Sequence, residues 1–559
     1  RYNAEYGFDK NGRQRYSQFN EYHKPQISLN HQWQIDYKSS LSTALYMSIG
    51  RGSGYSGQGR TSADRNMWKG TNYGVLNTTF RNPDGTFAYD KIQEMNAASP
   101  DGSRMIMSKS NNNHMWYGLL STYTNQISKS LELSAGIDVR YYIGEHNNEI
   151  IDLYDGKYFI DDSSRANVKP EQNAAAADPN WVYEKLQVGD KVYRDYDGHV
   201  HQEGVFAQLE WTKKNLNAFV SGSVSNTGYW RYDRFYYDAA HAESEHVNFI
   251  GYTVKGGANY NINEKHNVFA NLGYISRAPF FSGGAFLNST NSNAINKDAV
   301  NEKVMSYEIG YGYNSRTFAI SVNAYWTKWM DRSGLSRRGE FSRADGTFYM
   351  NMTGVDARHM GIEMNFNWIP VRWLNVEGMI SWGDWIWDSN ANGYFYNQLG
   401  PPIQNLTDGA LADGIGAENH LKSTLNQKGV KVGGSAQTTG SLSLTFLPFK
   451  GFRIGGDWVM NARNYSDFYI SPSSLGTKAI NVNDLWQIPW GQQLDLNASY
   501  RFKIGNVNAT LYGNVYNLFN YNYIMDAQTP TTSNGTWQEA YSVFYSFGRT
   551  YTVRMRINF

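Results

Sequence analysis

The chain has 559 residues, of which 15% are aromatic and only 18% are charged, and its mean hydropathy is −0.59. The absence of cysteine excludes disulfides, thiolate zinc sites and cysteine nucleophiles. A formal net charge of +1, with basic residues scattered among acidic ones, gives no reason to expect a nucleic-acid partner. No apolar run approaches the roughly 18 residues that a membrane-spanning helix needs, so two classes remain: a soluble all-β protein and a membrane β-barrel.

In chain order, many segments alternate strictly between apolar and polar side chains, which is the period of a β-strand. "ISLNHQWQIDY", "LELSAGIDVRYYI" and "GIEMNFNW" each have one wholly apolar face and one polar face. They are about as long as a tilted strand that crosses a bilayer, roughly 9 to 11 residues. The pattern predicts about 17 strands, near residues 26–37, 41–50, 113–128, 131–145, 201–214, 216–232, 247–262, 266–279, 302–315, 317–331, 346–368, 372–388, 436–449, 452–466, 490–504, 506–520 and 547–559.

Short and long connections alternate along the whole chain. The short ones include "KSS", "SKS", "KKN", "IPVR" and "PFKG", and the long polar ones include residues 146–200, 280–301, 386–435 and 464–489. Outer-membrane barrels have this arrangement, because their short turns face the periplasm and their long loops face outward. The sequence therefore predicts an all-β fold, a transmembrane antiparallel β-barrel, with no domain boundary within residues 1–559.

The last strand, "YTVRMRINF", follows the same pattern. We expect its apolar face toward lipid, where it would close the barrel against the first strand and serve as the barrel-assembly signal; this face comprises Tyr551, Val553, Met555, Ile557 and Phe559. Arg554 and Arg556 would then point into a polar lumen. An edge strand of a soluble sheet is the alternative for this segment.

Charged residues on the polar faces of the strands are predicted to face the lumen or a plug inside it. Besides the two arginines of the last strand they are Asp36, Glu132, Asp138, Arg140 and Glu363. Taken singly, each is more readily explained as a structural lumen charge than as a substrate ligand. The odd strand count, and a start that reads as the end of an external loop, predict that this chain is the C-terminal part of a longer barrel.

Two regions resemble TonB-dependent outer-membrane transporters. "LGYISRAPFFSGGAFLN", with Arg277 and Pro279, and "VNEKVMSYEIGYGY", with Glu308, are similar to a strand-loop-strand region of that family. "VYNLFNYNY" is similar to the signature of its penultimate strand, with Asn517, Leu518, Phe519 and Asn520. Phe559 resembles the terminal residue read by the barrel-assembly machinery, and "YHKPQISLNHQW" resembles members from Bacteroidetes-like bacteria.

The resemblance implies a barrel of 22 strands, an N-terminal plug and a TonB box. The 17 predicted strands would be strands six to twenty-two, with the plug domain not in this chain and TonB engaged through a missing N-terminal segment. The implied function is active uptake of a scarce external ligand, which could be a siderophore, haem, vitamin, peptide or oligosaccharide. Outer-membrane lipid and the barrel-assembly machinery are the implied partners, and a surface lipoprotein over the loops stays open.

A passive porin-like channel is the alternative function, and a surface adhesin or barrel enzyme is a third. Catalysis has no positive sequence evidence, and no cofactor is expected. The two histidines of "HAESEH" have the spacing of neither a metal-binding helix nor one strand face. "HVH" could present His199 and His201 on one face, and "DYDG" resembles a calcium loop but lacks the downstream acidic ligand. We therefore predict neither catalytic nor metal-binding residues.

One loop segment, "GYWRYDRFYYD", combines aromatic surfaces with guanidinium donors. We assign Tyr229 and Trp230 to the aromatic girdle at the outer membrane interface. The remaining residues are the candidate external ligand-binding loop: Arg231, Tyr232, Arg234, Tyr236 and Tyr237.

Overall fold

The fold is described from a computed structural model of the 559-residue chain. The structure describes residues 5–16, 19–68, 76–166, 168–287, 292–333, 340–343, 346–397, 422–470, 479–483, 485–505, 507–531, 535–540 and 542–558.

The main sheet is a barrel of eighteen strands. In chain order these strands are β3 (Phe19–His23), β4 (Gln26–Gln34), β5 (Ser39–Gly59), β7 (Met105–Ser128), β8 (Leu131–Asp152), β9 (Lys191–Lys213), β10 (Leu216–Asp233), β11 (Val247–Asn261), β12 (His266–Arg277), β13 (Glu302–Asn314), β14 (Phe318–Arg332), β17 (Val355–Val371), β18 (Leu374–Trp387), β21 (Thr438–Phe446), β22 (Phe452–Ala462), β27 (Gly491–Ile504), β28 (Val507–Tyr516) and β31 (Thr550–Asn558).

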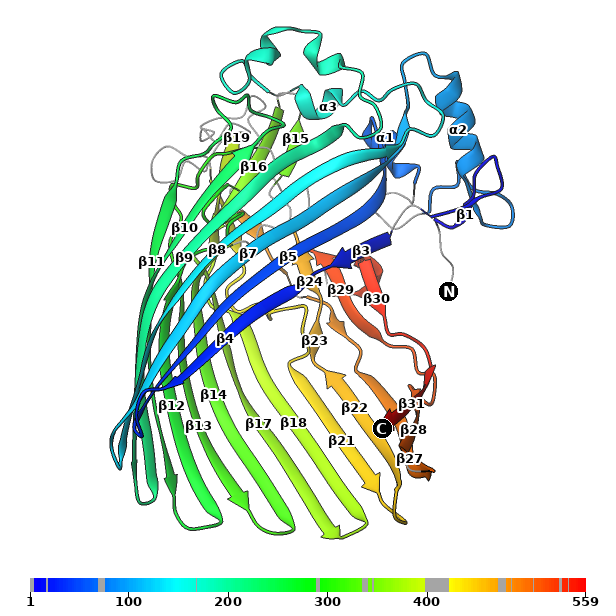
Figure 1. The fold of residues 1–559 in the computed structure, drawn as a ribbon. Coiled ribbons are helices and arrows are strands. Elements are labelled where there is room, and N and C mark those ends of the chain that lie inside the picture. Colours follow the sequence, from blue (N-terminus) through cyan, green and yellow to red (C-terminus); the bar gives the residue numbers. More distant parts are fainter. Residues whose placement is uncertain are drawn as a thin grey trace.

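Antiparallel register pairs run without interruption from β4 through β5 and onward to β28 and β31. β3 and β4 pair with successive stretches of the same strand, β5, so the wall has seventeen positions. Figure 1 shows the tilted strands, with the tight turns at the bottom of the view and the long connections at the top. This is the alternation of short and long connections that the sequence shows.

The two faces of the wall differ as the alternation requires. Ile137 and Val139 of β8 are exposed apolar residues, and Ile137 is registered against Val205 of β9, which is also exposed. Asp138 and Arg140 alternate with them on the other face, where Arg140 donates a hydrogen bond to Gln202. The apolar stripe is the face for lipid, so the polar set lines the lumen.

Several strands are longer than the sequence pattern predicts. β7 begins at Met105 instead of near residue 113, and β8 continues to Asp152 instead of ending near residue 145. The far ends of the extensions carry apolar residues that are buried in local cores, among them Met105, Ile106 and Ile150. The stretch nearer the apolar band is polar, as in "SNNNH", and a polar strand has no hydrophobic alternation to detect. The wall on the side of β5 to β9 therefore rises well above the band.

A second sheet stands at the end of the barrel that carries the long connections. It contains β15 (Glu340–Arg343), β16 (Gly346–Thr353), β19 (Ala391–Asn397), β20 (Lys422–Asn426) and β25 (Ala479–Asn481) in that order. Its buried side chains share a core with the upper ends of β17 and β18. This sheet fixes the position of the barrel rim beneath it.

The second sheet corrects two predictions. Residues 346–368 were predicted as one strand, but the chain turns at Gly354, whose φ is +71°, and splits into β16 and β17. Residues 386–435 were predicted as a loop, yet they contain β19 and β20. A left-handed glycine breaks strand pairing, and this one stands within an otherwise continuous strand pattern.

The other described elements are short. The strands are β1 (Gly7–Phe8), β2 (Gln14–Arg15), β6 (Phe87–Ala88), β23 (Asn464–Tyr465), β24 (Asp467–Tyr469), β26 (Gln487–Ile488), β29 (Ile524–Pro530) and β30 (Ser542–Tyr545), and the helices are α1 (Ser62–Asn66), α2 (Tyr89–Ala98), α3 (Asp162–Arg165), η1 (Ala174–Ala177), η2 (Trp181–Tyr183) and η5 (Trp537–Glu539). Among the described residues, no helix has the length and apolar character to cross a membrane.

Candidate functional site

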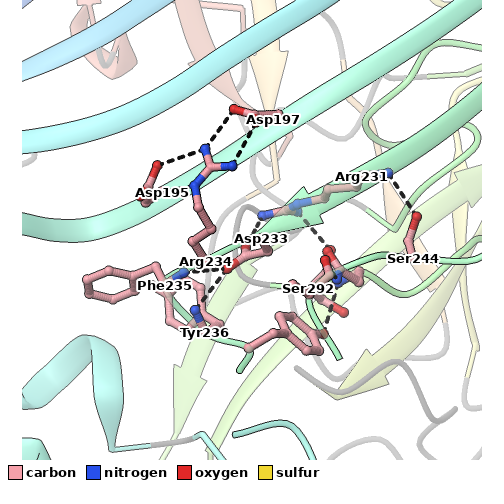
Figure 2. Close-up of polar contacts among 12 residues, drawn as sticks. Asp195, Asp197, Arg231, Asp233, Arg234, Phe235, Tyr236, Ser244 and Ser292 are labelled. Atoms are coloured by element: carbon pink, nitrogen blue, oxygen red, sulfur yellow. Dashed lines mark hydrogen bonds and ion pairs between the residues drawn. The ribbon is translucent and has the colours of Figure 1, made fainter. Parts of the chain in front are cut away.

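The predicted ligand-binding loop begins inside β10, which contains Arg231 and Tyr232, and continues into the connection to β11. It is tightly packed in the structure. Arg231 is 2% exposed, and its guanidinium donates to the carboxylate of Asp233 at 2.8 Å and to the carbonyl of Ser292 at 2.8 Å (Figure 2). It also lies 3.8 Å from the ring centroid of Tyr196. The guanidinium therefore joins this loop to the β12–β13 connection.

Arg234 is held by two carboxylates of β9. Its guanidinium contacts Asp197 at 2.7 and 2.8 Å and Asp195 at 3.2 and 3.4 Å (Figure 2). Hydrogen bonds from Arg234 to Asp197 and Asp195 raise the pKa of the guanidinium above its usual range. This arginine fastens the loop to the neighbouring strand.

Two tyrosines of the loop form hydrogen bonds with backbone groups of other segments. The Tyr236 hydroxyl donates to the carbonyl of Tyr193 at 2.6 Å, and the Tyr237 hydroxyl accepts from the backbone N–H of Asn293 at 2.9 Å. Tyr232 lies beside Arg234, 5.6 Å from its guanidinium carbon, and bridges to Glu243 through the backbone. A ligand-binding role for the five residues stays a prediction, but the polar groups just described have partners within the protein.

A second cluster lies on the lumen-facing side of the wall, where β12, β13, β14 and β18 meet the long connections. Its members alternate between aromatic rings and arginines. Arg277 lies 5.7 Å from the ring centroids of both Phe280 and Trp329, and Arg332 lies 5.8 Å from Trp329 and 5.5 Å from Trp387. We call these five residues the mouth ladder.

A buried carboxylate anchors one end of the mouth ladder. The side chain of Glu302 is 2% exposed, and one of its oxygens accepts from Arg277 at 2.6 and 2.9 Å. Its other oxygen accepts from the backbone N–H and the hydroxyl of Ser333, at 2.8 and 3.0 Å. Both oxygens are therefore engaged, and the charge of Glu302 is matched by Arg277.

An aromatic pair adjoins the mouth ladder. His359 and Trp385 stack with ring centroids 5.1 Å apart, and the Trp385 indole N–H donates to the hydroxyl of Tyr325 at 2.9 Å. Register places Tyr325 opposite Glu308, so this pair continues the lumen-facing side. Arg277 and Glu308 were marked in the sequence as family-motif residues, and Glu302 stands in the same "VNEKVMSYEIGYGY" segment. The other residues of this region come from separate strands, and their meeting depends on register.

The other family-motif residues have structural contacts. The Pro279 carbonyl accepts from the Tyr229 hydroxyl at 3.0 Å, and Glu308 accepts from Asn271 and Asn323 at 3.2 and 3.0 Å. Asn323 also donates to Glu363 at 3.3 Å, which joins two of the carboxylates across three strands.

The "NLFN" segment forms a turn after β28. Asn517 and Asn520 have φ angles of +53° and +52°, and the Asn517 backbone N–H donates to Asp495 at 2.7 Å. Leu518 donates its backbone N–H to Leu494, whereas the Phe519 side chain is 74% exposed. Asparagine tolerates the left-handed region, so the two asparagines suit this turn.

The remaining predicted lumen charges are distributed along the wall. Glu132 lies on the same face of β8 as Asp138 and Arg140, and is registered against Glu210. Asp36 instead lies in the turn after β4, where hydrogen bonds from the backbone N–H groups of Lys38 and Ser39 lower its pKa. These roles stay predictions.

The last strand pairs with β28 along its whole length. Arg554 lies over Tyr512 at 4.6 Å, and Arg556 donates to Asn558 at 3.1 Å. The predicted assembly-signal residues of this strand are exposed, namely Tyr551, Val553, Met555 and Ile557. Phe559 lies outside the described residues.

The fold and the matching sequence model identify the family. The model described as "TonB dependent receptor-like, beta-barrel" matches residues 1–518. The chain belongs to the TonB-dependent receptor family. This receptor is therefore a protein of the bacterial outer membrane, and TonB and the outer membrane are the family's working partners. No curated protein sequence matched the receptor significantly.

Solved structures share the fold of the receptor. The ferric citrate transporter FecA in its unliganded form has 11% identity and a TM-score of 0.58, with 97% of this chain and 62% of that chain covered. The ferric-catecholate import receptor Fiu from E. coli K12 has 12% identity and a TM-score of 0.54, with 96% and 64% covered. The ferric yersiniabactin uptake receptor FyuA from Yersinia pestis has 11% identity and a TM-score of 0.54, with 97% and 62% covered. The receptor chain thus spans under two thirds of the length of these relatives.

The comparisons correct one part of the predicted fold class. The sequence analysis placed the plug domain outside this chain. The alignment of 97% of the chain with FecA reaches both barrel and plug of such receptors, so that exclusion is wrong. The all-β fold and the family are confirmed. The porin-like alternative has no support among the relatives, and a Bacteroidetes origin is not shown by them.

Proposed function

We propose that the complete receptor takes up a scarce external ligand across the outer membrane by active transport, with TonB supplying the energy. The family match supports this proposal, and so do the similar solved structures, which include a ferric citrate transporter, a ferric-catecholate import receptor and a ferric yersiniabactin uptake receptor. Metal chelates are therefore the first ligands to test, with haem, vitamins, peptides and oligosaccharides as the other classes.

The mouth ladder is the observation that carries the proposal. Its strand residues stand where β12, β14 and β18 lead into the long connections, on the face that register assigns to Glu308, and an external ligand would arrive at this end. Further along the lumen face, Glu308 and Glu363 are linked through Asn323, and these carboxylates could receive cationic groups inside the barrel. A ligand-binding mouth above a polar lumen is the arrangement that gated uptake needs.

Two partners beyond TonB belong to the same proposal. The barrel-assembly machinery would recognise the exposed apolar face of β31, and a surface lipoprotein would cover the outer loops. Enzymatic activity is not part of the proposed function.

The test is energy-dependent accumulation in cells. The full-length receptor is expressed in a host that lacks its own ferric-chelate receptors, and ⁵⁵Fe accumulation is measured from ferric citrate and from a ferric tris-catecholate. We expect accumulation that disappears when TonB is deleted or a protonophore is added. Accumulation that persists in both cases would identify a passive channel, and no accumulation of either chelate would overturn the metal-chelate class.

A further inference from the structure

The mouth ladder contains an arginine whose charge is not matched. Glu302 uses one oxygen for Arg277 and the other for Ser333. Among the residues that the structure describes, none accepts a hydrogen bond from the Arg332 guanidinium or forms an ion pair with it. One positive charge therefore remains on the lumen side of the mouth.

A β-bulge in β14 places the Arg332 side chain on the lumen side of the wall. In a regular strand Asp331 would share the face of Trp329, and Arg332 would point to the opposite side. The register shifts between Trp329 and Arg332, and Asp331 has a φ of +54°. Asp331 is held there by the Lys303 ammonium at 2.8 Å and by its own N–H, which donates to Asp356 at 3.1 Å. Bulges commonly redirect a side chain in this way.

The two indoles around Arg332 hold its guanidinium in place. Trp387 is 6% exposed and belongs to the core shared with the second sheet, and Trp329 packs against the same core. Both ring centroids lie within 6 Å of the guanidinium carbon, close enough for cation–π attraction, and the N–H groups of a planar guanidinium then stay available to a ligand. Arg332 as a whole is only partly buried.

We propose that Arg332 is an oxyanion-binding subsite, which takes a carboxylate or phosphate group of the ligand through the N–H edge of its guanidinium. Such a fork matches two oxygens of either group, and the pair is stronger where solvent is restricted. The subsite rests on the proposed function for its position in uptake, because it makes the transported ligand an anion. Its binding chemistry requires neither TonB nor an energy source.

Binding to purified full-length receptor tests the subsite. Isothermal titration is run with citrate, ferric citrate and inorganic phosphate, and the neutral sugar maltose serves as the uncharged probe. Arg332→Gln is expected to weaken binding of the preferred anion about tenfold or more, and Arg332→Lys to weaken it less, since it keeps the charge but loses the fork. Arg316→Gln removes the same charge from the turn at the opposite end of the barrel and should leave the affinity unchanged.

Chemical modification gives a second readout that does not depend on which anion is preferred. Phenylglyoxal followed by peptide mapping should modify Arg332 faster than Arg277, whose guanidinium is engaged by Glu302. Citrate or phosphate should protect Arg332 selectively. Protection by citrate alone would assign a carboxylate ligand, and protection by phosphate alone a phosphorylated one.

Two outcomes would overturn the subsite: an Arg332 that reacts no faster than Arg277, or a reactive Arg332 that neither anion protects, with equal affinities for wild type and Arg332→Gln. Failure of the uptake test with intact anion binding would instead overturn active transport and leave the subsite standing. The two proposals are therefore separable.

Discussion

Arg234, a residue predicted to bind ligand, holds a loop to the neighbouring strand. Asp195 and Asp197 are each 17% exposed at the side chain, and Arg234 contacts both. Arg234→Gln would leave two adjacent carboxylates without a counter-ion. Because the arginine itself is 40% exposed, we expect a loss of only about 1 kcal/mol in loop stability. Limited proteolysis should then cut residues 235–245 faster.

The exposed turn residue Lys265 provides the matched control for Arg234, since Lys265→Gln also removes one positive charge. Adding Asp197→Asn to Arg234→Gln should restore part of the resistance to proteolysis, because one of the repelling charges is gone. Equal cleavage rates for wild type and Arg234→Gln would show that the ion pairs contribute nothing to the loop.

Asp238 gives the loop contacts a defined pH dependence. Hydrogen bonds from the backbone N–H of Ala174, at 3.0 Å, and from His241 lower the pKa of Asp238 below 3.8. A lowered carboxyl pKa stabilises the folded loop above pH 3.8, and this contribution is lost as the pH falls through the folded pKa. Hydrogen exchange of residues 172–176 should therefore accelerate in acid beyond its intrinsic pH dependence. Asp238→Asn should abolish the extra change, and an equal acceleration in wild type and Asp238→Asn would contradict the assignment.

The sequence showed which side chains can donate hydrogen bonds, but not which groups accept them in the folded protein. Arg231 and Arg234 were recognised as guanidinium donors beside aromatic rings. The partner of Arg231 is Asp233, two residues away on β10, whereas the two carboxylates that hold Arg234 lie on β9 and meet it only in the folded protein. Arg332 could not be selected at all, because its direction depends on the bulge at Asp331, and no single-sequence pattern marks a bulge at an aspartate.

The backbone conformation of the short turns that join neighbouring strands affects the stability of each hairpin. Lys214, in the turn between β9 and β10, has a φ of +52°, which costs a non-glycine residue about 1 kcal/mol. Lys214→Gly should stabilise the hairpin by about that amount. The unfolding temperature of such barrels can be measured from their heat-dependent mobility in SDS gels. We expect this temperature to be slightly higher for Lys214→Gly than for wild type.

A substitution at Gly451, in the turn between β21 and β22, is expected to lower the stability of the barrel. The φ of Gly451 is +88°, and a Cβ built there would lie 2.7 Å from the carbonyl oxygen of Arg501. Gly451→Ala therefore adds steric overlap with backbone to an unfavourable φ, and we expect a loss of at least about 1 kcal/mol. If both variants shifted the unfolding temperature in the same direction, turn conformation would not be the controlling factor.

At the scale of elements, the sequence was informative wherever a strand has one face in lipid. β8, β17 and β31 were recognised because apolar and polar residues alternate in them. The polar upper parts of β7 and β8, and the second sheet above the rim, were missed because they are stabilised by pairing and a local core and not by a lipid-facing stripe.

The position of the whole molecule in the membrane follows from the two faces of the wall. On β8, Ile137 and Val139 belong to the exposed apolar band, whereas Asn147, ten residues beyond Ile137 on the same face, pairs with Asn111 in the polar extension. At about 3.3 Å per residue, Asn147 lies roughly 33 Å further along the strand. The turn residue Ser130 lies at the other end of β8.

Because the chain contains no cysteine, single-cysteine variants can test this placement directly. Asn147→Cys should react with a membrane-impermeant maleimide on intact cells, since its side chain is above the bilayer. Ile137→Cys should stay unreactive because it faces lipid, and Ser130→Cys should react only after the outer membrane is permeabilised. Labelling of Ser130→Cys but not Asn147→Cys on intact cells would mean that the long connections face the periplasm. The mouth ladder would then lie on the periplasmic side, where it could not receive a ligand arriving from outside the cell.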